Sequence, residues 1–168
     1  MQATRMEKSN LKPGHLKRIK SLALLDDAQL AAFLNYIEVV NLTQSAALFQ
    51  EGQAGDSMFL ILEGQMRVFT RKRDSEEALL LRMLEAGDSF GEIALLSQIP
   101  RSATVEATKP SVLIQISASM LNRLLAEQPA LAAQFLFHVA KTLGRQLTDL
   151  TTKLRVRSAQ VDLLSHCH

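Results

Sequence analysis

The sequence predicts a mainly β domain, an antiparallel sandwich or barrel with flanking helices, followed by one long C-terminal helix. Between Ile37 and Ile116, short apolar segments alternate with turns, several of which contain glycine. This alternation is typical of antiparallel sandwiches and barrels, in which the strands are short and the turns tight. From about residue 117 onward, the apolar residues recur at helical spacing instead. The change of period separates the β domain from the C-terminal helical part.

Composition indicates one globular domain in a reducing compartment. The chain has 168 residues, of which 47% are hydrophobic, and its formal net charge is +2. This length allows a sizeable core, and so small a net charge gives no general argument for nucleic-acid binding. Cys167 is the single cysteine, so an internal disulfide is excluded. A polar N-terminus and the lack of a long apolar run lead us to expect a cytoplasmic protein.

Residues 1–20 form a basic N-terminal arm. Its charged residues are six cations and one acid: Arg5, Lys8, Lys12, Lys17, Arg18, Lys20 and Glu7. We expect this arm to be solvated and partly disordered. The domain itself is expected over residues 21–128. Near its start, Asp26 followed by Gln29 is typical of a capping box, which predicts that a helix begins there.

Seven strands are predicted within the β domain. They cover residues 37–42, 46–49, 58–62, 66–69, 78–84, 103–107 and 111–116. Glycines at 52, 55, 64 and 87 lie between them, where tight turns need backbone conformations that other residues rarely adopt. Ser119–Glu127 is predicted to be a helix that ends at Pro129.

The last predicted element is one long helix over residues 129–165. Its apolar residues fit a heptad repeat with one polar break, Arg157. Positions a are Ala133, Ala140, Leu147, Leu154 and Val161, and positions d are Leu136, Leu143, Leu150, Arg157 and Leu164. From Leu143 onward we expect this seam to form a parallel homodimer. The alternative is a helix that packs only on its own β domain.

The candidate site lies in the segment Phe90–Val105, FGEIALLSQIPRSATV. Gly91 allows the backbone to bend before a short helix, whose free N–H groups would face an anion. Arg101 offers a planar set of donors that suits phosphate oxygens. Glu92 would repel a phosphate, so a sugar hydroxyl is its natural partner. These residues predict a pocket for a small sugar phosphate. The alternative is a surface helix with a Glu92–Arg101 salt bridge and no ligand.

The same segment resembles the phosphate-binding cassette of cyclic-nucleotide-binding domains, found in catabolite-activator-type regulators, regulatory subunits of cyclic-AMP-dependent kinase and nucleotide-gated channels. The resemblance extends over roughly residues 24–150 and implies an eight-stranded antiparallel jelly-roll barrel with helices at both ends. It implies that Glu92 holds the ribose 2′-hydroxyl and Arg101 the cyclic phosphate. The implied ligand-binding residues are Phe90, Gly91, Glu92, Ile93, Ala94, Arg101, Ser102 and Ala103.

In this family the C-terminal helix closes over the purine, so the resemblance places Gln146, Thr148 or Thr151 within reach of the base. The implied function is a non-catalytic homodimeric receptor for cyclic AMP, with cyclic GMP as a second ligand, that signals through the long helix to a protein effector. The family's transcription factors continue into a helix-turn-helix domain, for which Ser158–His168 is too short, so we expect no DNA binding by this chain.

Two other function classes are weighed against the receptor. One is a structural or interaction module that keeps the barrel and has lost the ligand, against which the presence of both Glu92 and Arg101 counts. The other is an enzyme acting on a nucleotide. The sequence shows no serine, histidine and aspartate grouping for nucleophilic catalysis and no metal-ligand spacing, so we expect no catalytic residue, metal or cofactor.

Overall fold

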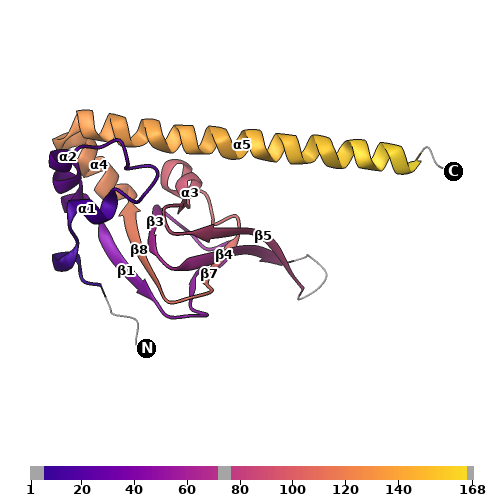
Figure 1. Ribbon diagram of the computed structural model, residues 1–168, viewed down its shortest axis with the longest axis horizontal. Helices are drawn as coiled ribbons and strands as arrows, with labels where there is room; N and C mark the ends of the chain where they lie inside the picture. The colour runs from indigo at the N-terminus through magenta and orange to yellow at the C-terminus, as the bar shows by residue number, and fades with distance from the viewer. Residues whose placement is uncertain (1–5, 72–76, 166–168) are drawn as a thin grey trace.

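The computed structural model describes residues 6–71 and 77–165, which form two four-stranded antiparallel sheets with the helices gathered at one end and along one side of them (Figure 1). The strands are β1 (Glu38–Leu42), β2 (Ala47–Phe49), β3 (Ser57–Glu63), β4 (Gln65–Arg71), β5 (Ala78–Glu85), β6 (Ser89–Phe90), β7 (Thr104–Ala107) and β8 (Ser111–Ser117). The helices are η1 (Lys8–Asn10), α1 (Pro13–Leu16), α2 (Asp27–Phe33), η2 (Leu34–Tyr36), α3 (Glu92–Ser97), α4 (Ala118–Glu127) and α5 (Pro129–Ser165).

The strand order is β1-β8-β3-β6 in the first sheet and β2-β7-β4-β5 in the second. Every pairing recorded between the described strands is antiparallel and stays within one of these two sheets. The mainly β, antiparallel fold with flanking helices is therefore confirmed. The closed barrel implied by the resemblance is not shown, because the strands pair as two separate sheets.

Strand β3 carries side chains into two different hydrophobic cores. Phe59 and Ile61 pack in an inner core with residues of both sheets. Met58, Leu60 and Leu62 point the other way, into an outer core shared with the helices. Successive side chains of a strand face opposite sides, so a strand buried on both faces reads as one continuous apolar run. The first sheet is thus the middle layer of the molecule.

The N-terminal segment packs against the domain, so the expectation of a solvated arm is wrong for its described residues. Leu11, Leu16 and Ile19 are buried in the outer core. The backbone N–H of Lys20 donates to the Gly87 carbonyl oxygen at 3.1 Å. The basic residues between these apolar ones suggested a solvated segment, yet burial of the apolar side chains stabilises the packed form.

The predicted capping box at the start of α2 is confirmed. The Gln29 backbone N–H donates to Asp26 Oδ1 at 2.8 Å, and the Asp26 N–H donates to Gln29 Oε1 at 3.0 Å. Two of the N–H groups that a helix leaves unpaired at its start are satisfied in this way.

Helix α5 begins against the outer core, runs past α3 and continues beyond the sheets (Figure 1). Leu131, Phe135 and Val139 in its first turns are buried, whereas Leu147 and Leu150 are 66% and 54% exposed. The dimer seam stays a prediction, and the side chains of Leu154, Arg157, Val161 and Leu164 lie outside the described part of the chain. No described helix combines the length and apolar character needed to cross a membrane.

Candidate functional site

The candidate site is built where β6 turns into α3. Gly91 precedes the helix with φ +82°, in the left-handed region that glycine tolerates best. A side chain at this position would also lack space, because its Cβ would lie 2.9 Å from Arg101 Nη1 and 3.1 Å from the Ser57 carbonyl oxygen. The glycine therefore serves both the turn and the close approach of Arg101.

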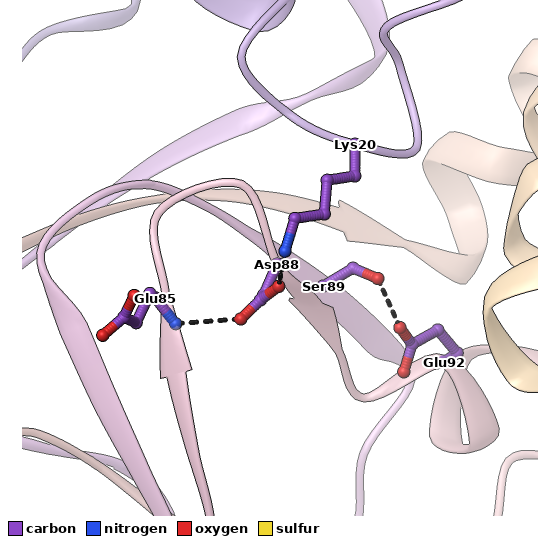
Figure 2. Close-up of polar contacts among 5 residues, drawn as sticks. All are labelled: Lys20, Glu85, Asp88, Ser89 and Glu92. Carbon is purple, nitrogen blue, oxygen red and sulfur yellow. Dashed lines mark hydrogen bonds and ion pairs between the residues drawn. The ribbon is translucent and has the colours of Figure 1, made fainter. Parts of the chain in front are cut away.

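Glu92, the first residue of α3, is a buried carboxylate held by one neighbour. Its side chain is 4% exposed, and Ser89 Oγ donates to Glu92 Oε1 at 2.6 Å (Figure 2). Ser89 lies in β6, so the short strand fixes the residue that orients the carboxylate. Glu92 remains a lining residue of the adjacent cavity. A carboxylate in this position can accept hydrogen bonds from hydroxyl groups of a ligand.

The turn before β6 is tied to the N-terminal segment. Lys20 Nζ lies 2.6 Å from Asp88 Oδ1, and the Glu85 backbone N–H donates to Asp88 Oδ2 at 3.0 Å (Figure 2). Burial by itself would raise the pKa of Asp88, but the Glu85 N–H, Lys20 and Arg82 together outweigh it, so the pKa lies below its ordinary value. The ionised carboxylate thus stabilises the turn that leads into the site.

Arg101 is a buried cation that has no carboxylate partner among the described residues. Its side chain is 7% exposed, and Nη1 donates to the Ser57 carbonyl oxygen at 2.7 Å. Nε is buried and has no hydrogen-bond partner among the described residues. The guanidinium carbon lies 4.1 Å from the ring centroid of Phe49 and 5.6 Å from that of Phe59.

The electrostatic setting of Arg101 favours an added anion. Burial lowers the pKa of Arg101, and Asp56 acts against this shift. Across the described residues no ion pair joins Arg101 to Glu92, so the alternative of a Glu92–Arg101 salt bridge is wrong. The two charged groups are held apart, by Ser57 and by Ser89, and each keeps the capacity to bind a ligand group.

Both charged residues line one cavity of about 530 Å³ between α3, the second sheet and α5. Its lining residues are Phe49, Val68, Leu81, Arg82, Leu84, Ser89, Phe90, Gly91, Glu92, Ile93, Ala94, Pro100, Arg101, Ser102, Ala103, Val105, Gln146, Asp149 and Leu150. All eight residues that the resemblance assigns to the cassette line this cavity, and their contacts with a ligand stay a prediction. A volume in this range suits a small-molecule site.

Of the three residues expected near a purine base, the structure brings only Gln146 to the cavity. Thr148 and Thr151 do not line it. Their hydroxyls donate to carbonyl oxygens one turn earlier in α5, those of Gly144 at 3.0 Å and Leu147 at 2.8 Å.

Sequence reasoning missed several residues that shape the cavity. Asp149 lies three positions after Gln146 on α5, and residues at this spacing share a helix face. That spacing is a signal that could have identified Asp149. Ser89 carries a signal of the same kind, because it stands three residues before Glu92. Phe49 carries none, because it meets Arg101 only through the fold.

The arrangement suits binding better than catalysis. A guanidinium and a carboxylate face one largely apolar cavity, which can accommodate an anion, a hydroxyl-bearing group and a flat apolar ring. Within the described residues no cluster of three or more histidine, cysteine, aspartate or glutamate side chains could hold a metal ion.

One family model matches this chain, that of the cyclic nucleotide-binding domain, over residues 39–128 and so over more than half of the 168 residues. Among curated proteins, the cGMP-dependent protein kinase of Toxoplasma gondii is 34% identical over 110 residues, which cover 66% of this chain and 10% of the kinase. The lysophospholipase NTE1 of Cryptococcus neoformans is 29% identical over 108 residues, which cover 64% of this chain and 6% of that protein. The chain therefore spans about a tenth or less of these relatives.

Solved structures share the fold. A cyclic nucleotide-binding domain from Methylobacillus flagellatus superposes with a TM-score of 0.76 at 22% identity, covering 86% of this chain and 80% of that one. The regulatory domain of PKA from Toxoplasma gondii, crystallised with cAMP, superposes with a TM-score of 0.63 at 20% identity, covering 80% and 50%. At these identities the likeness shows a common fold and no more.

Proposed function

We propose that this chain, which belongs to the cyclic nucleotide-binding domain family, is a non-catalytic receptor for a cyclic purine nucleotide. The observation that carries the proposal is the environment of the Arg101 side chain. Its guanidinium is buried, has no carboxylate partner among the described residues, and leaves Nε without an acceptor. A buried unpaired charge is costly, so proteins retain one where a ligand supplies the missing partner. The cyclic phosphate is that partner.

Glu92 supports the sugar half of the proposal. Ser89 holds Oε1 of this buried carboxylate, and the side chain lines the same cavity as Arg101. A carboxylate accepts a hydrogen bond from a hydroxyl group and repels a phosphate, so Glu92 suits the sugar and Arg101 suits the phosphate. We assign the ribose 2′-hydroxyl to Glu92 and the phosphate to Arg101, with the Ser102 hydroxyl as a further hydrogen-bond donor to the phosphate.

The base is proposed to lie against the α5 side of the cavity, beside Gln146, Asp149 and Leu150. Cyclic AMP is the first candidate. Cyclic GMP is the second candidate. Asp149 supports it, because a carboxylate can accept hydrogen bonds from the N1–H and the amino group of guanine together. Adenine offers one amino donor next to an acceptor nitrogen, which a carboxylate repels. The likeness to a cGMP-dependent protein kinase supports the same candidate.

We further propose that the response passes through α5, in the cytoplasm, to a protein effector. Leu147 and Leu150 are exposed by 66% and 54% beyond the part of the helix that packs on the domain. Apolar side chains at heptad spacing on one helix are suited to pairing with a second copy of the chain. Because Leu150 also lines the cavity, a ligand there would contact the same helix that forms the proposed dimer seam.

Isothermal titration with cyclic AMP, cyclic GMP and linear 5′-AMP tests the proposal. We expect micromolar or tighter binding of one cyclic nucleotide and much weaker binding of 5′-AMP, because its phosphate is not tied to the 3′-oxygen and is therefore not held at a fixed position relative to the 2′-hydroxyl. The recovered nucleotide should be chemically unchanged, which separates a receptor from an enzyme. Lack of binding by both cyclic nucleotides would contradict the proposal and favour a structural or interaction module.

A further inference from the structure

We propose that Phe49 is a positioning residue that holds the Arg101 guanidinium in the orientation that binds the ligand phosphate. The inference rests on the proposed function for the ligand, but its structural basis is the protein's own contact between the two side chains. The guanidinium carbon lies 4.1 Å from the Phe49 ring centroid, the shortest of the cation–π distances found among the described residues. Arginine in this geometry is attracted to the ring face.

A bulge in β2 accounts for the direction of the Phe49 side chain. The pairing of β2 with β7 shifts register between Ala47, which faces Glu106, and Phe49, which faces Val105. An extra residue in one strand changes the direction of the side chains beside it. Phe49 is thereby brought to the cavity wall and to Arg101.

The backbones on which the two side chains stand are also tied together. The Gly52 N–H donates to the Arg101 carbonyl oxygen at 2.8 Å, and the Arg101 N–H donates to the Gln53 carbonyl oxygen at 2.8 Å. Both bonds come from the turn that follows Phe49. Ring and guanidinium are therefore placed by one short stretch of paired backbone.

The remaining contacts leave Arg101 little freedom. Nη1 is occupied by the Ser57 carbonyl oxygen. Gly55 approaches so closely that a Cβ there would lie 2.6 Å from the guanidinium carbon. The Phe49 ring itself packs beside Phe59 and Phe90, with centroids 5.9 and 6.2 Å away. A ring fixed in this way holds the cation better than a flexible aliphatic side chain can, which reduces the ordering that ligand binding requires.

The test compares Phe49→Leu with Phe49→Tyr by titration against the cyclic nucleotide that the wild type binds. We expect Phe49→Leu to weaken binding about tenfold, equivalent to about 1.4 kcal/mol, and Phe49→Tyr to stay within twofold because the aromatic face remains. Phe69→Leu is the matched control, since Phe69 also carries an arginine over its ring, Arg67 at 5.1 Å, but does not line the cavity. It should leave affinity unchanged. Wild-type affinity in Phe49→Leu would overturn the inference.

An unfolding cycle separates this inference from the proposed function. The loss in stability caused by Phe49→Leu is measured by denaturant unfolding without nucleotide, in the wild type and in an Arg101→Met background. A larger loss in the wild type indicates direct coupling between ring and guanidinium. Equal losses would overturn the inference even if nucleotide binds. Conversely, a wild type that binds neither nucleotide contradicts the proposed function, but the unfolding cycle still tests whether Phe49 and Arg101 are energetically coupled.

Discussion

Replacing Arg101 by methionine is expected to weaken ligand binding without weakening the fold. Methionine keeps an apolar side chain of similar length beside Phe49 and removes the charge. Removing one partner of a buried charge pair costs about 2–5 kcal/mol. This corresponds to a loss of affinity of roughly 30-fold to several thousand-fold.

The expected effect on stability follows from three contributions at the same side chain. The Nη1 bond to the Ser57 carbonyl oxygen contributes about 1.5–3 kcal/mol, as is usual for a charged donor. The ring contact adds about 0.5–2 kcal/mol. Against them stands the burial of a cation whose Nε has no acceptor among the described residues, which costs several kcal/mol. We therefore expect an unfolding free energy that is unchanged or higher.

The assay pairs titration calorimetry with denaturant unfolding of the nucleotide-free protein. Arg67→Met serves as the control, because Arg67 is an exposed arginine paired with Glu106 at 2.8 Å and does not line the cavity. It should leave affinity unchanged. Either of two results for Arg101→Met would contradict the proposed role of Arg101: affinity within threefold of wild type, or a loss of stability above about 3 kcal/mol, which would make Arg101 a structural residue.

Four further substitutions test other contacts of the site. Ser89→Ala should weaken cyclic-nucleotide binding about five- to tenfold, because Glu92 loses the hydrogen bond that orients it, worth about 1 kcal/mol; titration at wild-type level would contradict this role. Asp149→Asn should shift the ratio of cyclic GMP to cyclic AMP affinity toward cyclic AMP, and an unchanged ratio would place the base elsewhere. Asp88→Asn should lower the unfolding free energy by about 1 kcal/mol at neutral pH. Since the folded-state pKa of Asp88 is lowered, this difference should be present above about pH 3.8 and vanish as the pH falls below it. Leu147→Asp should abolish the proposed dimer in sedimentation experiments, whereas a dimer that persists would place the interface on another surface.

Local signals in the sequence identified the parts of the site that depend on local geometry. Gly91 before Glu92 predicted the bend and the short helix, and the structure has both. The strand ends were predicted to within a few residues because glycine turns separate continuous apolar runs. β6 was missed, since two residues are too few to show any alternation.

Contacts between segments that are far apart in the chain could not be predicted from the sequence. The contact between Phe49 and Arg101 joins segments that are far apart in the sequence, and it depends on a register shift in β2. The packing of Leu11 and Leu16 depends on partners that come from the far end of the chain, such as those in α5. No pattern within a short window encodes such pairs.

The double burial of β3 has a consequence for amide hydrogen exchange. Its backbone can open to water only when the inner and outer cores both separate, so its N–H groups should exchange at the rate of global unfolding. β6, which leads into the cassette, pairs with this strand through Phe59–Phe90 and Leu60–Ser89. In deuterium-labelling experiments β3 therefore reports global stability, so the protection that it gains when ligand is added measures the free energy of ligand binding.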